Sequence, residues 1–279
     1  MEKGEFRSAI AGSGFTFKKK YGQNFITDGG LLERIVDGAG VDKRTTVIEI
    51  GCGAGTLTRE IAKKAKFVYG YEIDQTLRPV LSKTLAGVDN AEIIFKDFTR
   101  VRIDQLEQTL PPYKVVANLP YYVTTPLIMA LVENSQKCQS LTVMVQEEVA
   151  DRLCAKAGTA DYGAITANVA LRGVCTVLER VGREKFTPSP NVDSAVVKIE
   201  LAPSRLDVED IEVYKKTVRA AFSSRRKTLE NNLINCFSLT RERAGEIIER
   251  CGFSRGVRGE ELTPQNFATL SNLLRGLEK

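Results

Sequence analysis

The sequence predicts an α/β fold, in which a Rossmann-like sheet is followed by a small all-helical C-terminal domain. Three observations predict it. Short apolar runs alternate with amphipathic stretches up to Pro203, a glycine-rich turn follows the first strand-like run, and helical periodicity dominates after Pro203. The length of 279 residues suits one medium domain and a smaller appendage. We therefore expect a flexible arm at 1–17, an α/β domain at 18–203 and a helical domain at 204–279.

The α/β prediction depends on the alternation of strand-like and helix-like segments. The predicted strands are 47–50, 67–72, 92–95, 114–118 and 141–145. The predicted helices are 30–39, 56–64, 75–85, 126–133 and 147–156. Alternation of this kind is typical of βαβ units, so the sheet should be parallel.

Two more β-rich segments, 175–181 and 194–201, flank a proline-containing loop at 186–193. They are expected to close the sheet edge as an antiparallel hairpin. The remaining helices are predicted at 208–222, 227–237, 241–251 and 264–276.

Composition excludes several classes of function. The chain has no histidine, which excludes every mechanism built on imidazole. Its six cysteines are scattered without a C-x-x-C pair, so we expect reduced thiols and neither a zinc site nor a redox motif. No apolar stretch has the length of a membrane span and the opening lacks a secretory signal, which favours a cytoplasmic protein. A net charge of +5 permits nucleic-acid binding without requiring it.

A cofactor site is predicted where the strand 47–50 runs into Gly51-Cys52-Gly53-Ala54-Gly55. Glycines at a strand-to-helix turn let the backbone approach a ligand closely. The spacing is G-x-G-x-G, so the site need not be shaped around a pyrophosphate. Glu72 ends the next strand, where doubly wound folds place a carboxylate that binds ribose hydroxyls. Together these features predict a nucleoside ligand.

Two aspartates near this site have less specific positions. Asp97 follows the strand 92–95, where it either accepts a hydrogen bond from the cofactor's adenine amine or only caps a helix. Asp74 is expected to cap the helix that follows it. The cofactor is either S-adenosylmethionine or a nicotinamide dinucleotide, and the next motif separates the two.

The run Asn118-Leu119-Pro120-Tyr121 ends the strand 114–118, where ligands bind in open α/β sheets. Adenine N6 is a poor nucleophile because its lone pair is delocalised into the ring. The Asn118 side-chain oxygen and the Leu119 carbonyl can accept its two N–H groups and free that lone pair for a sulfonium methyl. Pro120 would fix the turn, and Tyr121 would stack on the base. This motif favours S-adenosylmethionine; the bland alternative is an ordinary strand-exit turn.

From Phe17 to Gly276 the sequence resembles the ribosomal RNA adenine dimethyltransferase family, in particular its bacterial small-subunit members. The resemblance is carried by the glycine loop, Glu72, Asp97, the run at Asn118 and three further motifs. These are Tyr21-Gly22-Gln23-Asn24-Phe25-Ile26, Phe186-Thr187-Pro188-Ser189-Pro190-Asn191-Val192-Asp193-Ser194 and Ala221-Phe222-Ser223-Ser224-Arg225-Arg226-Lys227-Thr228-Leu229. The family's loop usually has proline at Cys52 and a larger residue at Ala54.

The resemblance implies roles for individual residues. Asn24 and Ile26 would close over the methionine end of S-adenosylmethionine, with backbone contacts from the loop glycines Gly51 and Gly53. Glu72 would bind the ribose, Asp97 the adenine, and Asn118 would take part at the reacting end. Phe186 would sandwich the target adenine against Tyr121, although composition alone favours a core position.

The resemblance also implies a reaction, in which each of two adjacent adenosines in the 3'-terminal hairpin loop of small-subunit (16S) rRNA gains two methyl groups. The domain 18–203 would be catalytic, the domain 204–279 would contact rRNA, and the enzyme would act as a monomer on an immature 30S particle. Candidate phosphate contacts are Lys18, Lys19, Lys20, Arg225, Arg226 and Lys227, with a solvated helix face as the alternative for the arginines. Alternative functions are a large-subunit rRNA adenine methyltransferase, a ribosome assembly factor and a nicotinamide oxidoreductase.

Overall fold

The computed structural model of the protein describes residues 15, 17–18, 22–203 and 205–276. The chain forms two compact units. The first, called here the α/β unit, comprises residues 1–150 and 174–201, and the second, the helical unit, comprises 151–173 and 202–279. The arm predicted at 1–17 lies almost entirely outside the described residues. None of the described helices is both long and apolar enough to cross a membrane.

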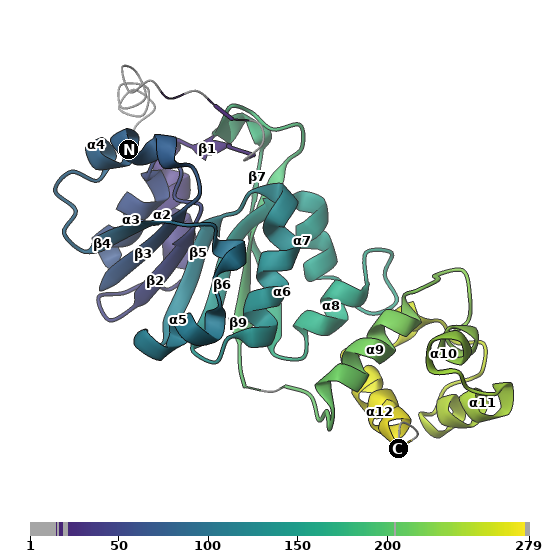
Figure 1. The fold of residues 1–279 in the computed structure, drawn as a ribbon. Helices are drawn as coiled ribbons and strands as arrows, with labels where there is room; N and C mark the ends of the chain where they lie inside the picture. The colour runs from purple at the N-terminus through teal and green to yellow at the C-terminus, as the bar shows by residue number, and fades with distance from the viewer. Residues whose placement is uncertain (1–14, 16, 19–21, 204, 277–279) are drawn as a thin grey trace. The chain divides into compact units, whose positions relative to one another are not determined.

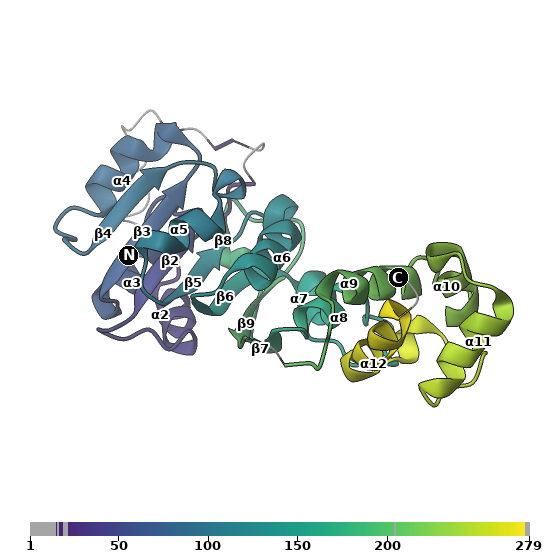
Figure 2. The same ribbon diagram turned by 60° about the horizontal axis from the view of Figure 1, so that its bottom comes forward.

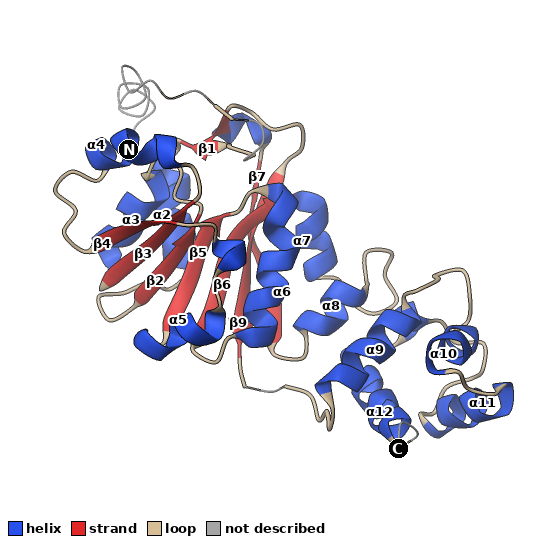
Figure 3. Cartoon of the chain, viewed as in Figure 1, coloured by secondary structure: helices blue, strands red, loops and turns tan. Residues whose placement is uncertain are grey.

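A seven-stranded sheet runs through the described part of the α/β unit, in the order β4-β3-β2-β5-β6-β9-β7 (Figure 3). The strands are β2 (Thr46–Ile50), β3 (Phe67–Glu72), β4 (Ala91–Phe95), β5 (Tyr113–Asn118), β6 (Cys138–Gln146), β7 (Gly173–Val181) and β9 (Ser194–Leu201). The pairs among β2 to β6 are parallel, whereas β9 is antiparallel to β6. The predicted parallel sheet is confirmed, with both β-rich segments at its far edge.

Parallel order places the carboxyl ends of β2, β3 and β5 side by side. All five residues of β2 are buried, as expected for a central strand covered on both faces. Helices α2 (Gly29–Gly38) and α3 (Thr56–Lys64) pack on one face, where Leu32 and Ile61 meet Val47 in a buried cluster. The sheet core therefore holds the glycine loop between β2 and α3 in place.

Several elements differ from the predicted ones. The helix predicted at 75–85 is a 3-10 turn (Gln75–Leu77) followed by α4 (Arg78–Thr84), with Pro79 in the first helical turn. α6 (Thr124–Asn134) and α7 (Glu147–Leu153) match predicted helices, and α7 ends earlier than expected. Four short elements were not predicted: α5 (Ile103–Thr109), α8 (Ala164–Val169), β1 (Phe25–Ile26) and β8 (Phe186–Thr187).

The helical unit contains α8 and the four C-terminal helices, which lie together in both ribbon views (Figures 1 and 2). The latter are α9 (Ile211–Ala221), α10 (Leu229–Phe237), α11 (Arg241–Arg250) and α12 (Pro264–Arg275). Each of these four helices begins directly after an N-cap residue whose side chain accepts a backbone hydrogen bond. The N-cap residues are Asp210, Thr228, Thr240 and Thr263. The apolar faces of the helices share one core with Tyr162 and Leu171. The predicted boundary at 203 therefore left out residues 151–173, which belong to this unit.

Candidate active site

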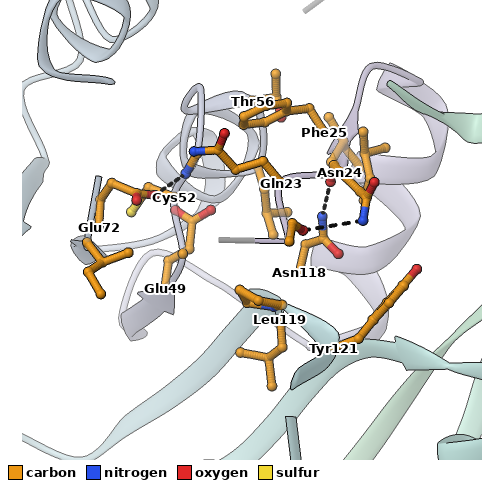
Figure 4. Close-up of a pocket in the computed structure, with 18 residues that line it drawn as sticks. Gln23, Asn24, Phe25, Glu49, Cys52, Thr56, Glu72, Asn118, Leu119 and Tyr121 are labelled. Atoms are coloured by element: carbon orange, nitrogen blue, oxygen red, sulfur yellow. Dashed lines mark hydrogen bonds between the residues drawn. The ribbon is translucent and has the colours of Figure 1, made fainter. Parts of the chain in front are cut away.

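A cavity opens at the carboxyl ends of β2, β3 and β5, where the sequence predicted a ligand site (Figure 4). It is lined by Gly22, Gln23, Asn24, Phe25, Ile26, Leu32, Glu49, Gly51, Cys52, Gly53, Thr56, Leu57, Glu72, Ile73, Asn118, Leu119, Pro120 and Tyr121. The structure thus brings together the predicted loop, the acidic end of β3 and the run after β5. Residues 22–26, which precede these elements in the sequence, also line the cavity.

The glycine loop needs glycine for two physical reasons. Gly51, Gly53 and Gly55 all have positive φ, at 79°, 56° and 80°. A Cβ atom on Gly53 would lie 2.6 Å from the ring of Phe25, which is closer than any contact it could keep. Gly55 is the N-cap of α3 and provides no side-chain hydrogen bond there, and Thr56 and Leu57 at the start of α3 line the cavity.

Glu72 is held at the end of β3 by backbone N–H groups. Gly53 N donates to Glu72 Oε2 at 2.8 Å and Asp74 N donates to Glu72 Oε1 at 2.7 Å. Burial raises the pKa of this carboxyl. Each carboxylate oxygen can accept a further bond, so Glu72 keeps its capacity to bind ribose hydroxyls from the cavity wall. Its ribose role stays a prediction.

Glu49 is a candidate functional residue that the sequence analysis missed. Its side chain lines the cavity although the residue is only 1% exposed. Oε2 of Glu49 has no hydrogen-bond partner among the described residues, and burial raises the pKa of the carboxyl to about 8. The sequence signal that could have identified Glu49 was its position as the single acidic residue of the apolar strand Thr46–Ile50, two positions before Gly51.

Asp74 and Asp97 both cap the turns that follow them, as one interpretation predicted. Asp97 accepts from Thr99 N at 3.0 Å, and Asp74 accepts from Thr76 N at 3.1 Å. Asp97 also lines a second cavity, together with Ile73 and Tyr122, which adjoins the first at Gly51, Ile73 and Pro120. A cap and a ligand role are therefore compatible at Asp97, and adenine binding there stays a prediction.

The run at the end of β5 is fixed by contacts from other segments. Asn118 Nδ2 donates to the backbone carbonyl of Asn24 at 2.8 Å (Figure 4). The hydroxyl groups of Tyr121 and Ser194 are hydrogen-bonded at 2.7 Å. The amide nitrogen of Asn118 is therefore used within the protein, which orients its Oδ1 as an acceptor.

Phe186 is a buried residue of the α/β unit. It is 4% exposed, pairs with Ile26 through strands β8 and β1, and packs in the core cluster of α2 and α3. It lines none of the three cavities described here, which agrees with the core alternative. The third cavity is instead lined by residues 188–192 together with Lys18 and Tyr121. Stacking by Phe186 stays a prediction.

The candidate phosphate contacts divide into three groups. Lys18 forms an ion pair with Asp74, with Nζ and Oδ1 2.7 Å apart, and Lys19 and Lys20 lie outside the described residues. Arg225 donates to the backbone carbonyls of Ala160 and Tyr162, at 2.9 and 2.6 Å. Arg226 and Lys227 are exposed in the turn between α9 and α10, and not on a helix face as the alternative supposed.

The cavity suits a nucleoside with a cationic tail better than a dinucleotide. Two buried carboxyl groups, Glu49 and Glu72, line the cavity with the glycine loop, and Oε2 of Glu49 has no hydrogen-bond partner in the described part of the chain. An ammonium or sulfonium centre bound beside them would favour their ionised forms, whereas the negative charge of a pyrophosphate would oppose ionisation further. The run Asn118-Leu119-Pro120-Tyr121, called here the acceptor turn, lies beside these groups. The whole arrangement is that of an S-adenosylmethionine-dependent methyltransferase.

Within that class the chain belongs to the ribosomal RNA adenine dimethylase family, whose family model matches residues 14–275. It is 43% identical to the ribosomal RNA small subunit methyltransferase A of Geobacillus thermodenitrificans, over 98% of this chain and 96% of that one. Identity to the protein of the same name from Streptococcus pneumoniae is 41%, over 97% and 96% of the two chains.

Two solved structures have the same fold. A dimethyladenosine transferase from Plasmodium falciparum matches with a TM-score of 0.74 and 25% identity, over 88% of this chain and 95% of that one. The 23S rRNA methyltransferase ErmE matches with a TM-score of 0.71 and 26% identity, over 90% and 100%. The nicotinamide oxidoreductase considered from sequence is therefore excluded.

Proposed function

We propose that this enzyme dimethylates the N6 amines of two adjacent adenosines in the 3'-terminal hairpin loop of 16S rRNA. The observation that carries the proposal is the meeting of Asn118-Leu119-Pro120-Tyr121 with the glycine loop and Glu72 in one cavity. The names of the two bacterial relatives, at 43% and 41% identity over nearly the whole chain, support small-subunit rRNA as the substrate.

Bound S-adenosylmethionine supplies an electrophilic methyl group on its sulfonium. The chain's own contribution is orientation and hydrogen bonding. Asn118 Oδ1 and the Leu119 carbonyl accept the two N–H groups of the adenine amine, which lets the nitrogen become tetrahedral. Asn118 is held for this task by its bond to the Asn24 carbonyl, and the ring of Tyr121 supports the base.

The proposal extends to the partner and the setting. Arg226 and Lys227, which are exposed in the helical unit, contact rRNA phosphates, whereas Arg225 holds the neighbouring loop. The α/β unit is catalytic and the helical unit contacts rRNA. The enzyme acts in the cytoplasm as a monomer, on the rRNA of an immature 30S particle. The folded shape of the RNA then carries much of the recognition.

A large-subunit adenine methyltransferase is the second candidate, because the fold of ErmE is similar. Mass spectrometry of rRNA separates the two. Immature small subunits and large-subunit rRNA are each incubated with enzyme and S-adenosylmethionine, and the methylated adenosines are mapped. We expect two dimethylated adenosines in the 3'-terminal hairpin of 16S rRNA. Methylation confined to 23S rRNA would overturn the proposal.

The Asn118→Ala variant tests the mechanism and the assembly alternative together. Loss of one acceptor for the reacting amine should lower methyl transfer by about 100-fold, while binding of S-adenosylhomocysteine stays largely intact. Retained binding to immature small subunits would show that assembly and catalysis are separable functions of one chain. Wild-type turnover of this variant would contradict the assigned role of Asn118.

A further inference from the structure

Asp74 carries a buried carboxylate that the methyl-transfer reaction does not use. The residue is 2% exposed and is absent from the residues that line the cavity at the strand ends. Its carboxylate accepts hydrogen bonds from Lys18 Nζ at 2.7 Å and Gln23 Nε2 at 2.9 Å. It also accepts from the hydroxyl and the backbone N–H of Thr76, at 2.7 and 3.1 Å.

Asp74 connects two parts of the cofactor-site lining through its backbone and its carboxylate. On one side, the backbone N–H of Asp74 donates to Glu72, whose other oxygen binds the loop at Gly53. On the other side, its carboxylate holds Lys18 and Gln23, and Lys18 N donates to Gln23 Oε1 at 2.8 Å. Residues 22–26, which include Gln23, form one wall of the cavity.

The wall formed by residues 22–26 packs against the glycine loop through aromatic side chains. The rings of Phe15, Phe17 and Phe25 lie 5.5 to 6.1 Å apart, centre to centre. Phe25 covers Gly53, where a Cβ atom would meet its ring. Apolar contacts of this kind have no direction of their own, so they do not fix the register of the segment along the loop. Hydrogen bonds to a single buried carboxylate fix that register, because they are directional.

The charge on Asp74 is maintained by these contacts. Burial alone would raise the pKa of the carboxyl, but hydrogen bonds from Lys18, Thr76 and Gln23 lower it below its ordinary value. The group is therefore ionised at neutral pH. Removal of a partner would leave a buried charge that is poorly satisfied, so the wall and the carboxylate stabilise one another.

We propose that the carboxylate of Asp74 is a positioning group that sets the affinity and residence time of S-adenosylmethionine, by holding Lys18 and Gln23 at the end of β3 without touching the cofactor. This role concerns cofactor binding and goes beyond the proposed rRNA substrate. Asn118 is attached to the same wall through Asn24, so these contacts also connect the cofactor wall to the acceptor turn.

The test compares Asp74→Asn and Lys18→Met with the wild type. Asparagine keeps an acceptor for Thr76 N, and methionine keeps the aliphatic stem of Lys18. Both variants remove the charge pair, and Lys18→Met also removes the bond from Lys18 Nζ to Thr76 Oγ1 at 2.8 Å. We expect S-adenosylhomocysteine to bind about tenfold more weakly in calorimetry, with faster dissociation, as for loss of one charge-assisted hydrogen bond. At saturating cofactor, kcat should stay within about twofold of wild type. Amide hydrogen exchange at 22–26 should accelerate in both variants without cofactor.

A double variant and a control complete the design. The double variant should bind no more weakly than either single variant, because both remove the same ion pair. Asp210→Ala, which removes an N-cap in the helical unit, controls for general destabilisation and should leave cofactor binding unchanged. The proposal would be overturned if Lys18→Met bound S-adenosylhomocysteine and exchanged its amide hydrogens at 22–26 as the wild type does. A fall in kcat without a change in cofactor affinity would also overturn it. Binding of S-adenosylhomocysteine needs no RNA, so failure of the rRNA assignment would leave this result interpretable.

Discussion

Tyr121 has a polar contact at the far end of its ring, and that contact determines how the ring is presented. Its hydroxyl bonds to Ser194 at 2.7 Å, and Ser194 is fully buried at the start of β9. Burial raises the pKa of the Tyr121 hydroxyl, so it stays protonated at neutral pH. The ring is therefore held by β9 at one end and by the turn after β5 at the other.

Loss of this bond should affect turnover more than cofactor binding. We expect Ser194→Ala to lower kcat by about fivefold, as for one net hydrogen bond of about 1 kcal/mol, with unchanged affinity for S-adenosylhomocysteine. Tyr121→Phe removes the same bond, so the two changes should not be additive in steady-state kinetics. Fully additive losses would show that Ser194 acts by another route.

Glu49 gives the free energy of unfolding a pH dependence of known sign. Its pKa is about 8 in the folded protein, above the ordinary 4.5. The folded state therefore keeps a proton that the unfolded state loses between these values. Stability should fall as pH rises through this window, by up to about 1.4 kcal/mol per pH unit.

Glu49→Gln removes that dependence, because glutamine does not titrate. Chemical denaturation at pH 5 and pH 8 should show a larger loss of stability in the wild type than in the variant. Parallel stability profiles for the two proteins would contradict the raised pKa of Glu49.

Individual site residues could be predicted from the sequence where their motif is local. Gly51, Gly53, Glu72 and the run at Asn118 were predicted at the cavity they line. Glu49 was missed because its strand was interpreted only for its apolar pattern. Contacts over long sequence distances, such as that of Arg225 with Tyr162, carry no local signal and need the fold.

At the scale of elements, the unpredicted helix α5 is anchored by one buried carboxylate. Glu107 accepts hydrogen bonds from Tyr113 Oη at 2.9 Å and Ser135 Oγ at 2.6 Å. It also accepts from the backbone N–H groups of Gln136 and Lys137. This group ties α5 to β5 and to the turn between α6 and β6, away from the cavity.

Removal of this carboxylate should destabilise the protein without affecting cofactor binding. Glu107→Ala leaves several buried donors unsatisfied and should cost roughly 3 kcal/mol in urea denaturation. Glu107→Gln keeps one acceptor oxygen and should cost less. A loss below about 1 kcal/mol in the alanine variant would mean that the donors find other partners.

The missed elements share a physical cause. α5 has seven residues and α8 has six, which is too short for helical periodicity to stand out. β1 and β8 have two residues each, and they exist only because Phe25 pairs with Thr187 far along the chain. Longer elements were found because pattern and propensity agree over many residues: α12 was predicted closely, whereas β6 was predicted only at its centre, with three residues missed at its start.

At the scale of the whole molecule, neighbouring basic residues should have different functions. Arg226→Ala with Lys227→Ala should weaken binding to immature small subunits and lower the slope of log affinity against log salt by up to about 2, with unchanged thermal stability. Arg225→Ala should instead lower the melting temperature, because it releases the loop at 160–162. An unchanged salt slope in the double variant would remove this turn from the rRNA contact.

The fold class and the order of the main elements could be predicted from the sequence, but the composition of the two units could not. A boundary at 203 follows the change in periodicity, whereas residues 151–173 join the helical unit through contacts such as Tyr214 Oη with the Ala167 carbonyl at 2.9 Å. Periodicity describes neighbours along the chain, and this assignment depends on packing between distant segments.

The chain crosses between its two units three times, after residues 150, 173 and 201. Neither unit is a single stretch of the gene. A single recombination crossover therefore cannot exchange the helical unit for another. Helix α8 would remain with the original α/β unit, and the core around Tyr162 would be mismatched. Change in the helical unit is consequently expected to accumulate by point substitution within a fixed interleaved order, and engineered chimaeras should keep 151–173 and 202–279 from the same parent.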